Sequence, residues 1–439
     1  MAEAAPPGRH MSSPSSTTRS TDTRSTDYSL ANPDTLTKYK TAAQISQKVL
    51  EQVKKLCTEG AKILEICQKG DKLLEDEVAK VFKGKKISKG ISHPCTVSPS
   101  TYVTPYTPLV SDAEEAATAL KPAEAVKIQL GAQIDGFGAI VCDTVVVGAG
   151  SEVTGRPADL MLATHYANEL LLRMMMPPGL LSAGTEEEKK KAQAQKPYSQ
   201  SKMTQLLEKV VKSYDCNLVE NTTCWLFGRN EIEDKKKIIL APGEGVKGEG
   251  LAEIGEVWGV EMGVSTGTGK VKSLPNRPTL HRRTTTTYGL KRPSSRATLS
   301  EIQKRFGTFP FSLRQLEDER SGKVGIVECV RGGVVRQYEV IGSSDGEPVS
   351  RLFSTVSVTK HGIQSLAGPP PMNIEQYKSE KKITDEEVLK ILEQPLAKPA
   401  SDKKKSKKKP KKKPAKKAAQ KEEEDEEDEE EDEDDDDDE

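Results

Sequence analysis

Residues 126–148 read VKIQLGAQIDGFGAIVCDTVVVG and carry the main evidence for the fold. Two runs rich in apolar and β-branched residues flank a Gly-rich centre. Apolar runs of this length, separated by turn-forming residues, are typical of two strands joined in a β-hairpin. We therefore predict that the halves of this segment pair side by side.

Composition indicates a folded centre with polar ends. Of 439 residues, 34% are hydrophobic and 30% are charged, which is polar for a compact chain of this length. The Ser/Thr-rich segment 1–35 and the charged segment 401–439 lack the apolar residues needed for a core. We therefore expect disordered termini around one folded domain at 36–400, with a mobile loop at 179–200.

The net charge of −1 hides two opposed blocks. Residues 402–439 contain twelve lysines and nineteen acidic residues, among them an unbroken acidic run at 422–439, so residues 1–401 carry +6. The lysine block at 402–421 predicts an electrostatic tether or a nuclear import signal.

Three features bear on the compartment. The seven cysteines form no CxxC pair, the first thirty residues contain no apolar signal segment, and no apolar run reaches the length of a membrane span. We expect a cytoplasmic and nuclear or nucleolar protein without a membrane partner.

Further elements follow from periodicity and turn signals. Helices are predicted from Ala42 to Leu56, from Gly70, from Pro157 and in LSEIQKRF. A last helix is predicted after Thr384, which is spaced from Glu387 as in a capping box. Strands are predicted in EVWGVEMGVST, KVGIVECV and RLFSTVSVT, and short strands and loops in ISHPCTVSPSTYVTPYTPLVSD. Helices between antiparallel strand pairs indicate an α+β fold.

Motifs for common cofactors are incomplete. STGTGK has Val264 and Val271 at positions that a phosphate-binding loop fills with Gly and Ser or Thr, and GFGAIV has Val141 at the last glycine of a dinucleotide fingerprint. The five histidines show no metal-binding spacing, and no nucleophile-elbow motif supports a Ser/His/Asp triad. The sequence therefore contains no complete phosphate-binding or dinucleotide-binding motif.

From about residue 36 to 396 the chain resembles the type II methionine aminopeptidases, which have the pita-bread fold. The shared landmarks are VKIQLGAQIDG, EVWGVEMGVSTG, YGLKRPSSRATLSEIQKRFGTFPFSLRQLEDE and RLFSTVSVT. Active members hold two divalent metal ions with two Asp, one His and two Glu residues, a donor set suited to activating a bridging water.

Carried onto this chain, the resemblance leaves one ligand of five. The positions fall on Gln129, Ile140, Thr222, Glu261 and Phe353, and a further active-site histidine falls on Pro105. An amide lacks the negative charge that favours a dication, and isoleucine and phenylalanine have no lone pair. The resemblance therefore implies a pseudoenzyme with no catalytic residue, no metal site and no cofactor, and we expect the apolar replacements to pack the pocket shut.

Within that fold the chain is similar to the non-catalytic proliferation-associated, ErbB-binding protein family. The shared features are the YGL…EIQ…RF segment, FPFSLR, IVECV and the lysine-rich C-terminus. This resemblance implies association with the large ribosomal subunit and rRNA near the nascent-chain exit, with roles in ribosome assembly, translation or transcription.

A basic segment at 265–305 supports a polyanionic partner, and we assign the docking insert to 268–318. Ser, Thr and Tyr are interleaved with the basic residues and can donate to phosphate oxygens. The predicted contact residues, against Glu301 as the one acid, are Lys270, Lys272, Arg277, Arg282, Arg283, Lys291, Arg292, Arg296, Lys304 and Arg305. A solvated surface loop is the plainer interpretation of such a run.

Two other functions stay open at this point. A DNA- or RNA-associated transcriptional regulator would use the same basic residues, and a metallo-aminopeptidase with unorthodox ligands would bind divalent metal. KRPSS resembles a basophilic kinase site, where phosphate on Ser294 or Ser295 would weaken binding to a polyanion. We expect a monomer that binds rRNA, other RNA or DNA, and protein partners.

Overall fold

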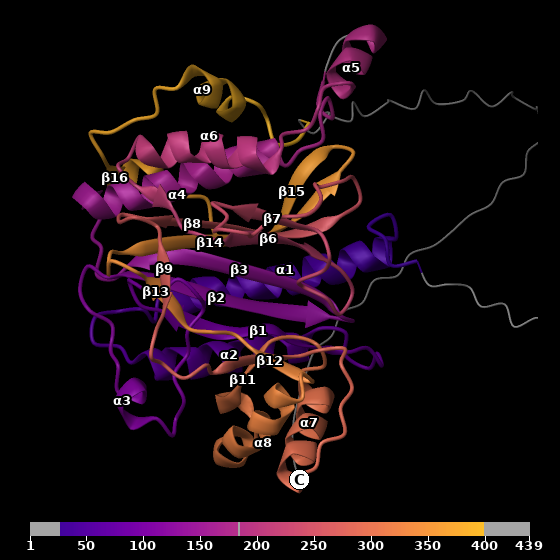
Figure 1. Cartoon of the computed structure of the whole chain (residues 1–439). Helices are drawn as coiled ribbons and strands as arrows, with labels where there is room; N and C mark the ends of the chain where they lie inside the picture. The colour runs from indigo at the N-terminus through magenta and orange to yellow at the C-terminus, as the bar shows by residue number, and fades with distance from the viewer. Residues whose placement is uncertain (1–26, 183–184, 399–439) are drawn as a thin grey trace, which may run out of the picture. The chain divides into compact units, whose positions relative to one another are not determined.

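A nine-stranded sheet organises the chain (Figure 1). The computed structural model describes residues 27–182 and 185–398. The strand order is β1-β2-β3-β14-β8-β6-β7, with β15 beside β14 and β5 beside β8, and all of these pairs are antiparallel. The strands are β1 Lys89–Ser98, β2 Ala125–Ile134, β3 Phe137–Val146, β5 Asn217–Leu218, β6 Thr222–Phe227, β7 Lys237–Leu240, β8 Val257–Ser265, β14 Val349–Thr359 and β15 Gly362–Ala367.

The predicted hairpin is confirmed as β2 and β3. The two strands pair without a break from Ala125 opposite Val146 to Ile134 opposite Phe137. Asp135 (φ 56°) and Gly136 (φ 82°) form the connecting turn. A two-residue turn with positive φ at both positions has the twist that matches antiparallel strands, which is why Asp-Gly favours it.

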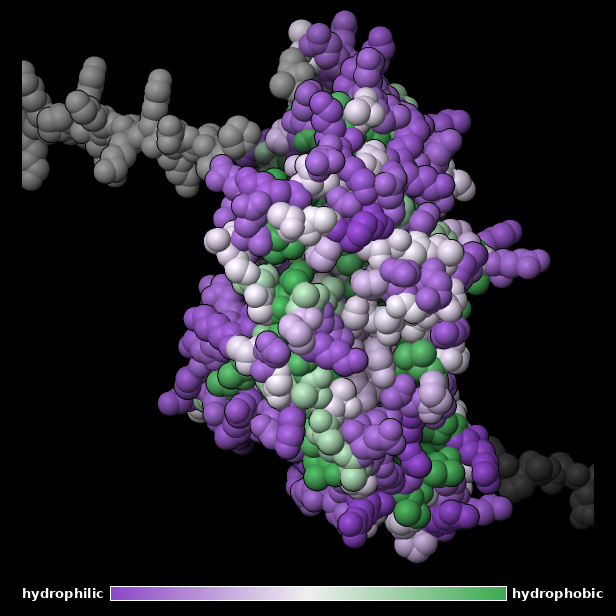
Figure 2. All heavy atoms as spheres, turned by 90° about the vertical axis from the view of Figure 1, so that its left-hand side faces the viewer, coloured by the Kyte–Doolittle hydropathy of each residue, from purple (hydrophilic) through white to green (hydrophobic). Residues whose placement is uncertain are grey.

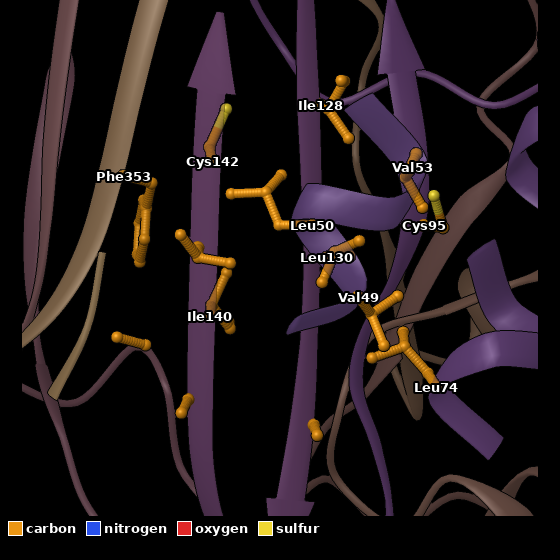
Figure 3. Packing of buried hydrophobic residues seen from close by; sticks show 14 of the residues in the cluster. Val49, Leu50, Val53, Leu74, Cys95, Ile128, Leu130, Ile140, Cys142 and Phe353 are labelled. Carbon is orange, nitrogen blue, oxygen red and sulfur yellow. The ribbon is translucent and has the colours of Figure 1, made fainter. Parts of the chain in front are cut away.

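Two pairs of helices pack against the sheet and bury separate hydrophobic clusters. α1 (Pro33–Lys54) and α2 (Ile63–Lys80) pack on β1, β2 and β3, while α4 (Gly155–Met174) and α6 (Gln200–Lys212) pack on the β8 and β14 side. Figure 3 shows the first cluster, in which Val49, Leu50 and Val53 of α1 face the strands. Helices packed on an antiparallel sheet confirm the α+β prediction.

A smaller lobe extends beyond β1 at the lower end of Figure 1. We call residues 279–337 the α7/α8 lobe. Its elements are β10 Leu280–Arg283, α7 Pro293–Arg305, β11 Phe311–Ser312, η1 Leu313–Gln315, α8 Glu319–Arg331 and β12 Val335–Gln337. It has its own core, in which Ile302 of α7 meets Ile326 and Cys329 of α8. The predicted insert boundary at 318 therefore divides two helices that pack together.

Arg314 connects this lobe to helix α2 and to strand β1 of the main sheet. Its guanidinium is 3% exposed and donates to Asp71 of α2 at 2.5 Å and to the carbonyl of Cys95 on β1 at 2.9 Å. A buried, charge-assisted pair of this kind fixes orientation as well as contributing energy. The lobe is therefore held in place on the body.

The remaining elements are short. They are α3 Ala113–Ala116, β4 Val153–Thr154, α5 Glu186–Gln193, β9 Val271–Ser273, β13 Ile341–Ser343, η2 Ile374–Gln376, β16 Tyr377–Lys378 and α9 Glu386–Leu392. Through the part of the chain described, no helix has the length and apolar character needed to cross a membrane. All seven cysteines are buried free thiols.

Four sequence predictions about secondary structure were wrong. KVGIVECV lies in helix α8, because Asp318 caps the helix and its buried residues recur at helical spacing. The loop predicted at 179–200 contains α5, which starts with a capping box between Thr185 and Glu188. α2 begins at Ile63 and not at Gly70, and the cap of α9 is Asp385 and not Thr384.

Several elements were not predicted, among them an amphipathic helix and a long strand. The amphipathic α6, with Met203, Leu206 and Val210 on its buried face, was not predicted. β1 runs over ten residues where only short strands and loops were expected. The predicted tail at 401–439 and most of the N-terminal segment lie outside the described residues.

Candidate functional site

The five positions expected to be degenerate metal ligands meet at one cavity. Gln129 on β2 lies opposite Cys142 on β3, Cys142 lies opposite Phe353 on β14, and Phe353 lies opposite Glu261 on β8. Ile140 shares a face with Cys142, two residues away on the strand. Gln129, Ile140, Glu261 and Phe353, together with Thr222 and Pro105, line a cavity of about 470 Å³.

Arg351 spans this row from within the sheet. Its side chain is 3% exposed, its Nε donates to Oε1 of Glu261 at 2.7 Å, and its Nη2 donates to Oε1 of Gln129 at 2.8 Å. Burial disfavours the charged guanidinium, yet the Glu261 carboxylate more than offsets this and raises the pKa of Arg351. A fixed positive charge thus lies between the Glu261 carboxylate and the Gln129 amide.

The residues present do not fit a pair of divalent metal ions. The carboxylate of Glu261 and the amide oxygen of Gln129 are already engaged by Arg351, and Thr222 Oγ1 donates to the Val219 carbonyl at 2.9 Å. Over residues 27–182 and 185–398, no group of three or more His, Cys, Asp or Glu side chains could hold a metal ion. A nearby guanidinium also repels a dication.

The prediction that apolar replacements close the pocket was wrong. Ile140 and Phe353 are buried, and Figure 3 shows them on the adjacent strands β3 and β14. They fill the floor, whereas the walls come from separate segments that include Trp225, Tyr338 and Ile341, and these leave the cavity open. Arg351 also lines the cavity, and its Nη1 is buried without a hydrogen-bond partner in the described chain.

Two residues of this site had no predicted role. His93 is buried, its Nδ1 lies 2.8 Å from the Pro94 carbonyl, and burial together with the charge of Arg351 lowers its pKa to about 4. It is therefore neutral near pH 7. Arg351 could have been found from the sequence, since it precedes Phe353 by two residues in RLFSTV and must share its face of the strand.

Most of the predicted polyanion contacts are exposed. Lys291, Arg292, Arg296, Lys304 and Arg305 lie on α7 and just before it. Lys270 and Lys272 lie beside and on β9, and Arg277 lies in the segment that leads to β10, so the structure does not bring all ten residues together. Four of these are engaged locally: Lys270 pairs with Glu220, Arg305 pairs with Glu301, Lys272 donates to the Ser344 carbonyl, and Arg296 donates to the carbonyls of Leu290 and Lys291.

Arg282 and Arg283 differ from the others. Arg282 is 6% exposed and forms ion pairs with Glu231 and Glu233, because β10 turns its side chain into the body. It therefore has no free surface to offer a polyanion. Arg283 is half-buried and its Nε donates to the Gly307 carbonyl at 3.1 Å.

The two serines of the KRPSS motif are not equivalent. Ser295 is fully buried beside Cys329, whose thiol contacts the Ser295 carbonyl, so a kinase cannot reach it in the folded chain. Ser294 is half-buried in the first turn of α7. A phosphate there would lie at the positive end of the helix.

Comparisons with known proteins agree with this architecture. The sequence model of metallopeptidase family M24 matches residues 37–273. A solved structure of a thermophilic Arx1 is 63% identical, superposes with a TM-score of 0.83, and covers 84% of this chain and 100% of that one.

Two curated relatives extend over most of the chain. The curved DNA-binding protein of Schizosaccharomyces pombe is 38% identical over 385 residues, which are 87% of this chain and 95% of the relative. The ErbB-3 binding protein 1 of Solanum tuberosum is 33% identical over 350 residues, which are 77% and 84% of the two chains. The chain therefore has the pita-bread fold and belongs to metallopeptidase family M24, among relatives named as ErbB-3-binding and Arx1 proteins.

Proposed function

We propose that the chain is a catalytically inactive member of family M24 that binds RNA and docks on the large ribosomal subunit near the nascent-chain exit, where it acts in ribosome assembly or translation. We infer the loss of catalysis from the hydrogen bonds that Arg351 donates to Glu261 and Gln129. A cation built into the chain stands where catalysis would need two metal ions and the water between them. The function then depends on surfaces and requires no cofactor.

The exposed basic residues of α7 support an RNA partner. Lys291, Arg292, Arg296 and Lys304 are exposed, and only Arg296 donates to nearby carbonyls, those of Leu290 and Lys291. Neighbouring Thr285, Thr286 and Thr287 are exposed as well and can donate to phosphate oxygens. Tyr288 is the one exposed aromatic side chain in this segment, so contacts to the backbone and shape of folded RNA are favoured over base stacking.

The surface of the lobe is not uniformly polar. Figure 2 shows a largely hydrophilic face on which apolar side chains gather at the lower end, over the α7/α8 lobe. Val324 and Val327 of α8 are 54% and 48% exposed. Exposed apolar side chains beside basic ones suit a partner that offers both RNA and protein, as the ribosomal surface does.

A second function is favoured by one relative. The Schizosaccharomyces pombe protein, 38% identical, is named as a curved DNA-binding protein. The same basic residues would then bind the backbone of duplex DNA, in a nuclear regulator of transcription. Cytoplasmic and nuclear or nucleolar location, a monomeric state and further protein partners are parts of the proposal that both functions share.

Fluorescence anisotropy with labelled RNA tests whether the basic residues of the α7/α8 lobe bind RNA. The test variant neutralises Lys291, Arg292, Arg296 and Lys304, and the control neutralises four lysines in and after α5: Lys189, Lys190, Lys191 and Lys196. We expect the lobe variant alone to bind a large-subunit rRNA fragment more weakly, with a salt dependence whose slope falls by about one unit for each phosphate that is no longer neutralised. Equal weakening in both variants would mean that overall charge, and not the lobe, binds RNA.

The same assay with duplex DNA separates the two functions. Preference for the rRNA fragment over bent duplex DNA at equal salt supports ribosome docking. Tighter binding to bent duplex than to rRNA would replace it with the DNA-associated function.

A further inference from the structure

A second basic segment lies outside the α7/α8 lobe. Residues 80–89, from the end of α2 to the start of β1, read KVFKGKKISK and contain five lysines and no acidic residue. We call this segment the lysine loop. Lys83, Lys85 and Lys86 are exposed and form no ion pair with any described residue, whereas the other two lysines are engaged within the chain. Three unpaired positive charges therefore project from one short turn.

The lysine loop has a strained backbone that packing holds in place. Phe82 has φ 49° and Gly84 has φ 75°. A bulky residue rarely adopts positive φ, and strain of this kind persists at functional sites where the surrounding structure imposes it. Phe82 and Ile87 both pack against the first hydrophobic cluster, one on each side of the three exposed lysines. The lysines therefore lie on a turn whose conformation is fixed by the core.

The tip of the β2–β3 hairpin joins the lysine loop to the end of α7. The backbone N–H of Asp135 donates to the carbonyl of Ser88, and the N–H of Asn230 donates to the carbonyl of Gly136 at 2.7 Å. Thr308, which follows the last residue of α7 by three positions, donates its hydroxyl to the Asn230 carbonyl at 2.5 Å. The lysine loop and the basic end of α7 therefore lie at the same end of the hairpin.

The surface between these two basic clusters is polar and compensated. The carboxylate of Asp135, at the hairpin tip, pairs with Lys38 and with Arg229, each at 2.7 Å. Ser88 and Asn230 are exposed and carry neutral polar side chains. Hydroxyl and amide groups of this kind donate to phosphate and sugar oxygens. The molecule thus presents two basic clusters with a neutral polar strip between them.

This arrangement suits a double-stranded RNA better than a single strand. Two basic clusters beside a neutral strip can contact the phosphates of both strands that border a groove, and the wide minor groove of A-form RNA offers its 2′-hydroxyls to the strip. Single strands gain affinity from stacking of bases on aromatic rings. The rings nearby are already covered, since Arg229 lies 4.4 Å from the ring centre of Tyr28 and Lys85 lies 5.3 Å from that of Phe82.

We propose that the lysine loop is a second RNA-binding surface, and that one RNA duplex contacts it together with the basic end of α7. The proposal rests on the proposed function, because it assigns a further surface and a double-stranded form to the RNA that the α7/α8 lobe binds. Lys83, Lys85 and Lys86 contact phosphates, and the exposed polar groups at the hairpin tip face the groove.

Fluorescence anisotropy with an RNA duplex of about 20 base pairs, and with a single strand of equal length, tests the proposal. The lysine-loop variant carries Lys83→Gln, Lys85→Gln and Lys86→Gln. Its matched control carries Lys378→Gln, Lys382→Gln and Lys390→Gln, which change three exposed lysines of β16 and the α9 region. We expect the lysine-loop variant to bind the duplex at least about fivefold more weakly at physiological salt, with a salt slope lower by about two to three units. The control should bind like the unchanged protein, which should prefer the duplex to the single strand.

The outcomes separate this proposal from the proposed function. If the lobe variant loses RNA binding while the lysine-loop variant binds no more weakly than its control, the second surface is wrong and the proposed function stands. Equal or tighter binding of the single strand by the unchanged protein would overturn the assignment of duplex RNA. If the unchanged protein binds neither RNA, both proposals fail.

Crosslinking locates the RNA independently of affinity. All seven native cysteines are buried, so Ser88→Cys introduces an exposed thiol that can carry a photoreactive label. We expect the label at position 88 to crosslink to the bound duplex, and a label at Lys382→Cys to give no crosslink. A bound duplex that crosslinks equally at both positions, or at neither, would contradict contact with the lysine loop.

Discussion

Nε of Arg351 lies 2.7 Å from Oε1 of Glu261, on adjacent strands of the central sheet. Glu261 is the one expected metal ligand that the chain retains, and the guanidinium that engages it reaches Gln129 as well. The position where the resemblance expects metal ions is thus held by a side chain of the protein. The guanidinium therefore supplies the positive charge that balances the Glu261 carboxylate.

Replacement of Arg351 by Met should destabilise the protein. Glu261 and Gln129 would both lose their partner, and breaking a buried ion pair costs about 3–5 kcal/mol. Because Glu261 keeps 21% of its side chain exposed, we expect about 2–4 kcal/mol in chemical denaturation.

The double variant Arg351→Met with Glu261→Gln serves as the control. It should recover part of the lost stability, since no unpaired charge remains. Additive losses in the two single variants would show that Arg351 and Glu261 do not interact energetically.

Divalent metal should neither bind in this cavity nor restore catalysis. Titration with Mn²⁺ or Co²⁺ should give no saturable heat that depends on Glu261, and peptides with an N-terminal methionine should stay intact. Metal binding that is abolished by Glu261→Ala, together with methionine release, would revive the metallo-aminopeptidase interpretation. An active type II methionine aminopeptidase assayed alongside ensures that the peptides are cleavable.

Acid should destabilise the fold through buried histidines. Burial lowers the pKa of His93 to about 4 from the ordinary value of 6.5, with Arg351 adding to the shift, and burial does the same for His281. A lowered histidine pKa gives stability that is complete above pH 6.5 and is lost as pH falls toward 4. Each group contributes a slope of up to about 1.4 kcal/mol per pH unit within that window.

The variant His93→Asn isolates one of these contributions. The unfolding free energy of the variant should fall less steeply than that of the unchanged protein between pH 6 and 5, because one proton fewer is taken up on unfolding. Buried carboxyls such as Asp71 titrate in both proteins and cancel in the comparison. Parallel pH profiles would show that His93 is not held neutral.

Phosphomimetic substitutions of the two serines in α7 should have different effects on stability. Ser294→Asp places a negative charge in the first turn of α7, where it should be neutral or stabilising by about 0.5 kcal/mol while weakening RNA binding. Ser295→Asp buries a carboxylate against α8 and should cost about 2 kcal/mol or more. The opposite order of stabilities in thermal unfolding would contradict the placement of these residues.

The sequence predicted the parts of the fold that follow local rules. The β2–β3 hairpin, α1, α4 and β14 all follow from periodicity and turn residues. The strand interpretation of KVGIVECV failed because a short, valine-rich run fits either structure until the cap at Asp318 and the packing against α7 select a helix.

The sequence indicated which residues lie at the candidate site, but not which hydrogen bonds and ion pairs they form. Gln129, Ile140, Glu261 and Phe353 meet as expected, because a shared strand register follows from the resemblance. The role of Arg351 depends on side-chain reach across three strands, and the burial of Arg282 depends on ion pairs with residues about fifty positions away. Neither can be read from local sequence.

Co-sedimentation with purified large ribosomal subunits at physiological salt tests the central claim most directly. The unchanged protein, the lobe variant (Lys291, Arg292, Arg296 and Lys304 neutralised) and the α5 control variant (Lys189, Lys190, Lys191 and Lys196 neutralised) would be compared, with small subunits as a specificity control. We predict that the unchanged protein and the α5 control bind large subunits and the lobe variant does not. Absence of binding by the unchanged protein, or equal binding by all three proteins, would contradict docking through the α7/α8 lobe.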